Sequence, residues 1–145
     1  MPAPIDTLHS RRRSGGPIRD FMTPAPTTIG CAQSLEAASK KMRRLKLRHL
    51  PVLDGGKLAG ILSQRDVYFV ETIGGVDPTA VRVDEAMSVD VYSVPPETPL
   101  AQVAHEMAEH KYGCAVVMDG THLIGIFTAV DALRLVAATM TTWTP

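Results

Sequence analysis

Two segments of the sequence share one pattern of a glycine, a hydroxyl and a carboxylate: Gly60–Asp66 (GILSQRD) and Gly125–Asp131 (GIFTAVD). In each, an apolar run leads into a residue, Ser63 or Thr128, whose hydroxyl can cap a helix. The first backbone N–H groups of such a helix are expected to be unpaired, and the helix dipole favours an anion such as phosphate. A carboxylate three residues later can accept both hydroxyls of a ribose. The pattern therefore favours recognition of a nucleotide.

The same residues also fit a purely structural role. Ser63 with Asp66, and Thr128 with Asp131, have the spacing of a capping box, in which the two side chains satisfy backbone N–H groups of the helix. The recurrence of the pattern does not decide between these roles, because a duplicated fold also duplicates its caps. Both interpretations stay open on the sequence alone.

The elements that position these segments come from an internal duplication. A constant offset of 65 residues relates Ile18–Val70 to Val83–Leu135 without a gap, and it matches glycines as well as apolar positions. Each copy predicts a short strand, a helix, two strands joined by an Asp-Gly turn, and a second helix. We therefore expect an α+β fold of two tandem βαββα repeats, related by a pseudo-twofold axis, with the two sheets packed against each other.

Helix signals and apolar runs place the expected elements in each copy. In the first, they are a short helix near Ile18–Met22, a strand at Thr28–Ile29, a helix over Ser34–Leu47 capped by Ser34, strands Leu50–Leu53 and Leu58–Leu62, and a helix after Ser63. In the second, they are a short helix near Val83–Met87, a strand at Tyr92–Val94, a helix capped by Thr98 with Pro99 at its first position, strands Ala115–Met118 and Leu123–Phe127, and a helix after Thr128. The predicted organisation is a flexible N-terminal arm (1–17), repeats at 18–75 and 76–140, and a C-terminal tail (141–145) carrying Trp143.

The run Arg48–Asp66 and the run Leu123–Asp131 resemble the cystathionine-β-synthase-type (CBS) domain, and the resemblance covers about Ile18 to Leu135. A tandem pair is that family's usual unit, the Bateman module. The resemblance implies a regulatory module that binds AMP, ADP, ATP or another adenosyl ligand in clefts between the paired sheets. From the motifs and spacings of the sequence itself, we expect no catalytic activity, no cofactor and no metal.

The resemblance also implies roles for individual residues. Asp66 and Asp131 would hold the ribose hydroxyls, and Ser63 and Thr128 would contact ribose or phosphate. The strand backbone at Leu50 and Val52, or at Ala115 and Val117, would line the adenine. Arg48 and Arg65 are candidate phosphate contacts, because a guanidinium fork matches phosphate oxygens. The second copy has Val130 in place of Arg65 and Gly113–Val116 in place of Arg48–Pro51, so we expect the first site to be the stronger.

Composition and motifs limit the other classes of function. The chain of 145 residues is 45% hydrophobic and 21% charged, as in an ordinary globular protein, and it has no apolar run of about 20 residues. The N-terminus lacks the apolar segment of a secretory signal, so we expect a cytoplasmic protein with no membrane partner. No nucleophile-elbow, Walker, Rossmann or metallohydrolase motif occurs. Cys31 and Cys114 lack metal-ligand spacing and are expected to be small buried side chains.

Charge is distributed unevenly between the two copies. The formal net charge is zero, which makes nucleic acid an improbable main partner, although the helix Ser34–Leu47 is basic. Ile18–Val70 carries nine Lys/Arg and four Asp/Glu, a balance of +5, whereas Val83–Leu135 carries two and eight, a balance of −6. Opposite charges favour a homodimer that pairs head to tail. The ligand-sensing module would act on a separate effector protein; the alternative is an assembly module that binds no small molecule.

Overall fold

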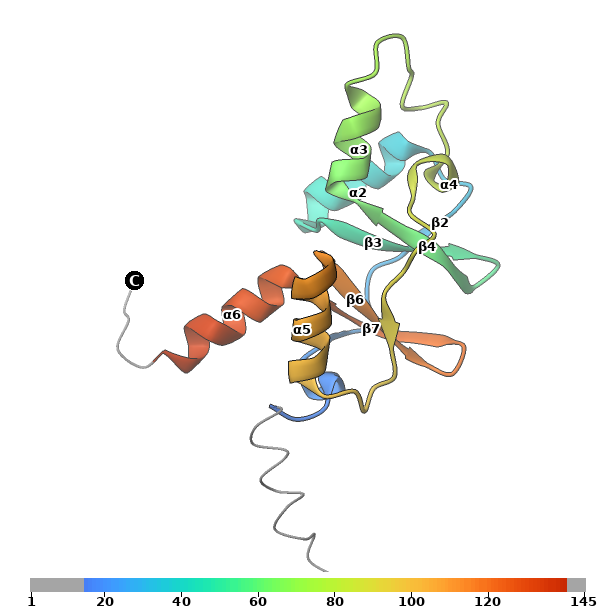
Figure 1. The fold of residues 1–145 in the computed structure, drawn as a ribbon. Helices are drawn as coiled ribbons and strands as arrows, with labels where there is room; N and C mark the ends of the chain where they lie inside the picture. Colours follow the sequence, from blue (N-terminus) through green and yellow to red (C-terminus); the bar gives the residue numbers. More distant parts are fainter. Residues whose placement is uncertain (1–14, 141–145) are drawn as a thin grey trace, which may run out of the picture. The chain divides into compact units, whose positions relative to one another are not determined.

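The computed structural model describes residues 15–140 and follows the βαββα order twice (Figure 1). The first half contains η1 (Ile18–Asp20), β1 (Thr23–Pro24), β2 (Ile29–Gly30), α2 (Leu35–Leu45), β3 (His49–Asp54), β4 (Lys57–Ser63) and α3 (Gln64–Glu71). The second half contains α4 (Val83–Ala86), β5 (Ser93–Val94), α5 (Leu100–His110), β6 (Cys114–Asp119), β7 (His122–Thr128) and α6 (Ala129–Thr139). The predicted α+β fold of two tandem repeats is confirmed. Of the predicted arm, only residues 15–17 are described, and the predicted tail with Trp143 lies outside the described residues.

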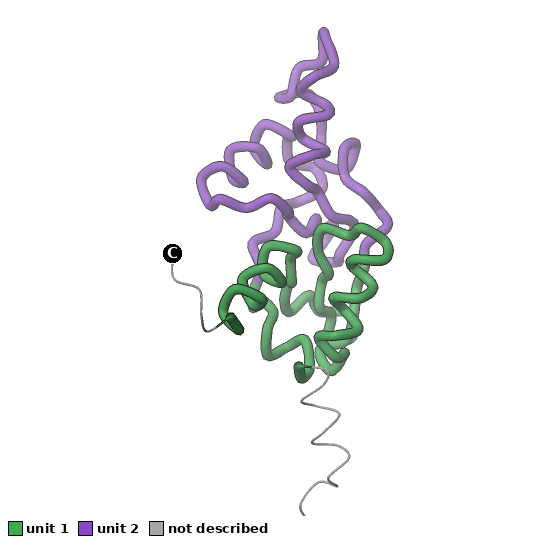
Figure 2. The backbone as a smooth tube through the Cα atoms, turned by 60° about the vertical axis from the view of Figure 1, so that its left-hand side comes forward, with its two compact units in different colours: residues 1–25, 92–145 green, residues 26–91 purple. Residues whose placement is uncertain are grey.

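The chain forms two compact units that do not coincide with the repeats of the sequence (Figure 2). Unit 2 comprises Pro26–Val91 and has a three-stranded sheet in the order β2-β3-β4. Unit 1 comprises the residues up to Ala25 together with those from Tyr92 onward, and its sheet has the order β1-β7-β6-β5. The segment η1-β1, which opens the first repeat, is therefore part of the unit that holds the strands of the second. In the same way, α4 opens the second repeat but belongs to unit 2.

The Asp-Gly signals correctly predict a tight hairpin in each unit. β3 pairs with β4 antiparallel, and Asp54 lies opposite Lys57. Between them, Gly55 and Gly56 have φ of +56° and +83°, left-handed values that glycine adopts without strain. β6 and β7 form the equivalent hairpin, with Gly120 at φ +61°. Each hairpin brings the start of its first strand beside the end of its second, where the hydroxyl residue lies.

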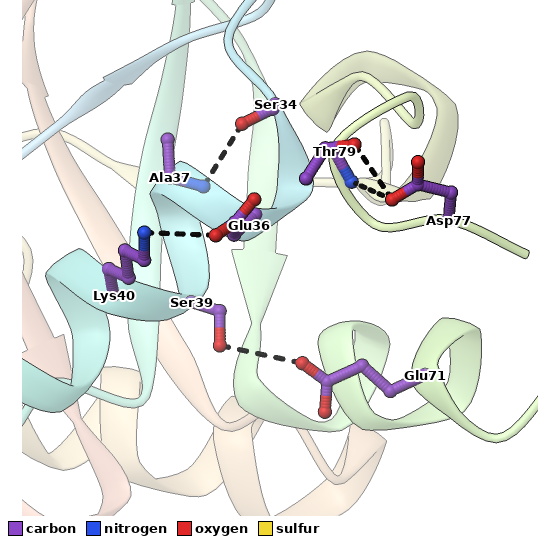
Figure 3. A network of polar contacts seen from close by, with 8 residues as sticks. All are labelled: Ser34, Glu36, Ala37, Ser39, Lys40, Glu71, Asp77 and Thr79. Carbon is purple, nitrogen blue, oxygen red and sulfur yellow. Dashed lines mark hydrogen bonds and ion pairs between the residues drawn. The ribbon is translucent and has the colours of Figure 1, made fainter.

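The helix α2 shows why the first repeat folds locally as the sequence predicts. Ser34 Oγ accepts a hydrogen bond from the backbone N–H of Ala37 at 3.1 Å, which caps the helix. Ser39 Oγ donates to Glu71 Oε1 at 3.5 Å and joins α2 to α3 within unit 2 (Figure 3). The helix ends where Lys46 takes a left-handed conformation, with φ +55°. The buried face of α2 consists of Leu35, Ala38 and Met42.

The helix α5 begins one residue later than predicted, and Thr98 does not cap it. Pro99 occupies the N-cap position in an extended conformation, with φ −60° and ψ 137° and no side-chain cap. The backbone before η1 pairs here: Ile18 N donates to Thr98 O at 2.7 Å, and Leu100 N donates to Gly16 O at 2.9 Å. These bonds hold Pro99 in a β-bridge with Pro17 and delay the start of the helix. The prediction failed because it considered only local capping signals.

Each unit has its own hydrophobic core. The core of unit 2 gathers the apolar faces of β2, β3, β4, α2, α3 and α4 around fully buried residues such as Leu35, Leu50 and Leu62. The core of unit 1 gathers Ile18 of η1 with side chains of β5, α5, β6 and β7, including Phe127. No helix in residues 15–140 has the length and apolar character needed to cross a membrane.

A methionine packs against a glycine in the sheet of each unit. In unit 2, a Cβ at Gly60 would lie 2.7 Å from Met87 Sδ and 2.6 Å from the backbone oxygen of Ser88. In unit 1, a Cβ at Gly125 would lie 2.8 Å from Met22 Cγ. These distances are too short for a real side chain, so the two strands need glycine at these positions. Met22 and Met87 are themselves 65 residues apart, as are the two glycines.

We predict that Gly60→Ala lowers the free energy of unfolding by about 1–3 kcal/mol, the usual cost of overpacking a close contact. Gly125→Ala should cost less, because the atoms it meets belong to the flexible Met22 side chain and none is backbone. Gly74→Ala is the matched control, since a Cβ there would meet nothing within 4 Å. Urea unfolding of the three variants measures these differences. Equal stability of Gly60→Ala and Gly74→Ala would contradict the close packing.

Candidate functional site

The candidate site of unit 2 lies where β4 runs into α3. Ser63 is the N-cap of α3, and its Oγ accepts a hydrogen bond from Asp66 N at 3.1 Å. In return, Asp66 Oδ2 accepts from Ser63 N at 2.9 Å. The two residues therefore form a complete capping box, as the structural interpretation of the sequence predicted.

Unit 1 repeats this arrangement at the junction of β7 and α6. Thr128 Oγ1 accepts from Asp131 N at 3.1 Å, and Asp131 Oδ2 accepts from Thr128 N at 2.9 Å. The geometry of the box is thus the same in both units. Any difference between the two candidate sites must come from the residues around the box.

The start of each helix offers fewer free N–H groups than the sequence predicted. In unit 2, Gln64 N donates to Arg48 O at 2.8 Å, and Asp66 N is occupied by Ser63. In unit 1, Ala129 N donates to Gly113 O at 2.9 Å. The expectation of unpaired donors is right only in part, because the residue before each hairpin supplies a carbonyl oxygen to the first N–H group and the cap occupies the third. A bound phosphate would therefore depend mainly on side chains.

The two carboxylates keep different amounts of hydrogen-bonding capacity. Oδ2 of Asp66 is used by the cap, and no described residue donates a hydrogen bond to its Oδ1. Oδ1 of Asp131 lies 3.8 Å from a guanidinium nitrogen of Arg134. A carboxylate can accept about four hydrogen bonds, so Asp66 retains an oxygen that can accept a ligand hydroxyl.

The positively charged side chains around the two capping boxes also differ. Arg48 directly precedes β3, Arg65 lies in the first turn of α3, and both are exposed. Neither forms an ion pair with any residue between 15 and 140. Gly113 and Val130 occupy the equivalent positions in unit 1, so that site lacks both guanidinium groups. Unit 1 thus lacks the two guanidinium groups that flank the capping box of unit 2, and the cation beside its own box is Arg134, next to Asp131.

The four predicted adenine-lining residues have their side chains in the two cores. Leu50 and Val52 on β3, and Ala115 and Val117 on β6, are all 0% exposed and pack in the core of their own unit. Their side chains are fully used in packing. Only backbone groups of these strands remain for a ligand, and the adenine contact stays a prediction.

His49 is a neighbour of the site that sequence reasoning did not assign to it. In the register of β3 and β4, it lies directly opposite Ser63. Its ring is half-buried, and this burial lowers the pKa of His49; the nearby Asp66 carboxylate raises that pKa and Arg48 lowers it further. The sequence held no clear signal for this neighbour: the two-residue turn alone would place His49 opposite Leu62, and a β-bulge between Val52 and Leu53 shifts the register by one residue.

Other reactive groups lie apart from this arrangement. Cys114 is buried, and burial raises the pKa of its thiol to about 12. It is thus a small buried side chain, as predicted, whereas Cys31 is only half-buried. In the described part of the chain, no three His, Cys, Asp or Glu side chains are grouped so that they could hold a metal ion.

A model of the CBS domain matches the chain twice, over residues 18–70 and 83–138. The chain belongs to the CBS-domain family. These two matches start at the same residues as the internal duplication, Ile18 and Val83. The resemblance recognised in the sequence is therefore confirmed, and the capping boxes lie within the two matched regions.

Relatives of similar length and solved structures agree with this assignment. Hypoxic response protein 1 of Mycobacterium tuberculosis is 29% identical over 117 residues, which cover 80% of this chain and 82% of that protein. The CBS domain pair of MJ0100, solved with 5′-methylthioadenosine and S-adenosyl-L-methionine, has a TM-score of 0.77 and 25% identity, covering 86% of this chain and 98% of that one. CBSX2, solved with AMP, has a TM-score of 0.76 and 26% identity, covering 86% and 99%.

We predict that His49 makes folding sensitive to acid. The folded protein holds the pKa of His49 below the ordinary value of 6.5, so below that pH the unfolded chain binds more protons than the folded one. The lowered pKa of His49 therefore has no effect on stability well above pH 6.5. As the pH falls below that value, protonation of His49 increasingly favours the unfolded chain. His49→Gln should reduce the loss of unfolding free energy between pH 7 and pH 5, measured by denaturant titration at each pH.

The matched control is His122→Gln, which removes an exposed histidine from the start of β7. This variant should keep the pH dependence of the wild-type protein. If His49→Gln and His122→Gln lose stability in parallel with wild type on acidification, the burial of His49 has no such effect.

Proposed function

We propose that this protein is a regulatory module that binds an adenine nucleotide, or a related adenosyl ligand, beside the start of α3. The observation that carries the proposal is the free hydrogen-bonding capacity of the Asp66 carboxylate. The helix cap uses Oδ2, and Oδ1 accepts no hydrogen bond from the described residues. Two exposed guanidinium groups, Arg48 and Arg65, lie in the segments that meet at this point. A carboxylate acceptor beside unpaired cations suits the ribose and phosphates of a nucleotide.

Comparison with solved structures supports an adenosyl compound as the class of ligand. Two structures with this fold were solved with adenosyl compounds, one with 5′-methylthioadenosine and S-adenosyl-L-methionine and the other with AMP. For this chain, the two guanidinium groups favour a ligand that carries phosphate. Unit 1 lacks them, and Arg134 stands near Asp131, so we propose that unit 2 holds the stronger site.

The proposed role is regulatory because the chain matches the CBS domain twice and two solved structures with this fold contain adenosyl compounds. A ligand that binds one conformation of the module more tightly shifts its equilibrium toward that conformation. The output would then pass to a separate effector protein or to a second copy of this chain. We propose a homodimer as the functional state.

A second candidate is an assembly module that binds no small molecule. The observation that favours it is that both capping boxes are complete without a ligand. In this case Ser63 and Asp66 would only stabilise α3, and loss of the cap by Ser63→Ala would lower stability by about 0.5–2 kcal/mol. The two candidates differ in whether the wild-type protein responds to nucleotides.

We predict that Asp66→Asn weakens nucleotide binding roughly ten- to a hundredfold, the effect of losing a charge-assisted hydrogen bond to a ribose hydroxyl. The fold should be preserved, because the Asn oxygen can still accept from Ser63 N. Arg65→Ala should weaken ATP and ADP more than adenosine, since only the phosphates would contact the guanidinium. Isothermal titration with AMP, ADP, ATP and adenosine measures these affinities.

Two variants serve as controls. Asp131→Asn makes the same change in unit 1 and should have a smaller effect if unit 2 holds the stronger site. Lys57→Ala removes one positive charge at the opposite end of β4 from Ser63 and should leave all affinities unchanged. Flat titrations of the wild-type protein with all four compounds would refute nucleotide binding and leave the assembly module as the better account.

A further inference from the structure

Unit 2 carries a group of exposed positive charges where α2 ends and β3 begins. A backbone hydrogen bond of 2.8 Å from Gln64 N to Arg48 O brings the start of α3 to the same place, and with it the exposed Arg65. None of the side chains in this group forms an ion pair or a hydrogen bond with any residue from 15 to 140. We call this group the basic surface; it consists of Arg43, Arg44, Lys46, Arg48 and Arg65.

The backbone that carries the basic surface is held in place by the end of α2. Leu47 N donates to Met42 O at 2.9 Å, and Lys46 N donates to Arg43 O at 3.4 Å. Lys46 itself has the left-handed conformation that ends the helix. Binding a partner here would therefore restrict side chains but would not have to order a loop, which lowers the entropic cost of association.

The second repeat shows that the fold forms without these arginines. The helix α5 has 11 residues, as α2 does, and it ends on a left-handed Lys111 as α2 ends on Lys46. Cations near the end of a helix interact favourably with its dipole, but α5 ends in the same way without an arginine. Under the offset of 65 residues, the arginines of the basic surface correspond to Ala108, Glu109, Gly113 and Val130. These arginines are therefore not needed for the fold and are available to a partner.

We propose that the basic surface binds a short acidic segment of a partner protein, in which Asp or Glu residues are combined with an apolar residue. A guanidinium group can donate two parallel hydrogen bonds to one carboxylate, so a group of arginines suits a run of carboxylates. Leu45, which is 42% exposed between Arg44 and Lys46, offers an apolar contact within the same surface. The charge and the exposed leucine together define the chemistry of the partner.

A nucleic acid fits the basic surface less well than an acidic peptide. The segment from residue 43 to residue 48 contains no aromatic side chain on which a base could stack. The formal net charge of the chain is zero, so the protein as a whole does not attract a polyanion over long distances. A phosphate backbone also offers nothing apolar to Leu45.

The basic surface shares Arg48 and Arg65 with the proposed nucleotide site. Phosphates of a nucleotide and carboxylates of the partner would compete for the same guanidinium groups, so bound ATP should lower the affinity for the partner. By linkage, the partner lowers the affinity for ATP by the same factor. This competition rests on the proposed function, whereas the binding of an acidic segment does not.

The test measures binding of the full chain to a fluorescein-labelled peptide of Glu residues interrupted by Leu, by fluorescence anisotropy. The double variant Arg43→Gln, Arg44→Gln removes two cations that lie outside the proposed nucleotide site. It should weaken binding of the peptide about two- to thirtyfold, the effect of losing two exposed ion pairs. The same peptide with Gln in place of Glu should not bind the wild-type protein. Wild-type affinity in the double variant would overturn the proposal.

The matched control is the double variant Lys57→Gln, Arg82→Gln, which removes the same charge from exposed positions of unit 2 outside the basic surface. It should keep the wild-type affinity for the peptide, and circular dichroism melts should show both double variants folded. Equal weakening in the two double variants would mean that net charge alone attracts the peptide, and would overturn the surface. Tighter binding of a DNA oligonucleotide than of the peptide would overturn the assignment to an acidic protein segment.

ATP separates this proposal from the proposed function. Added to the complex of wild-type protein and peptide, ATP should release the peptide. If ATP binds in isothermal titration but leaves the peptide bound, the competition at Arg48 and Arg65 is wrong. If ATP does not bind at all, nucleotide binding fails, and the two double variants still decide whether the basic surface binds the acidic peptide.

Discussion

The contact between a methionine side chain and a strand glycine is the constraint on which each unit depends. Met87 lies against Gly60 in unit 2, and Met22 lies against Gly125 in unit 1. In both cases the methionine follows the short helix that opens one repeat, and the glycine belongs to a strand of the other repeat. Neither repeat therefore completes its own core, because Val83 of the second repeat is buried in the core of unit 2 and Ile18 of the first is buried in the core of unit 1.

This constraint also determines where the candidate sites lie. Beside Gly60, the backbones of Ile61 and Ser88 exchange two hydrogen bonds of 2.9 Å, so the missing side chain lets a second backbone pair with β4. Ser63 follows two residues later and begins α3. The position of the capping box is thus determined by a strand that is held from both sides, by β3 and by the segment after α4. A rigid strand end is a suitable base for a binding site.

Local signals in the sequence were enough to predict most of the fold. The Asp-Gly turns, the apolar spacing of Leu35, Ala38 and Met42, and the cap at Ser34 each depend on neighbours within a few residues. The errors arose where distant segments meet. The late start of α5 depends on the backbone near Pro17, and the pairing of Gln64 N with Arg48 O depends on the hairpin. The spacing of apolar residues along a segment does not show which distant backbone groups will pair with it.

The two interpretations of the repeated motif, a helix cap and a ligand contact, are compatible because a carboxylate has two oxygens. The cap engages Oδ2 of both Asp66 and Asp131 in the same geometry, so it explains why the motif is present in both units. It does not require Arg48 or Arg65, which form no ion pair in the described residues and stabilise nothing by a salt bridge. The chemistry that distinguishes the two sites therefore lies in side chains that the fold does not need. An exposed unpaired cation contributes little to stability, so the guanidinium groups of Arg48 and Arg65 are available to bind an anion at this end of α3.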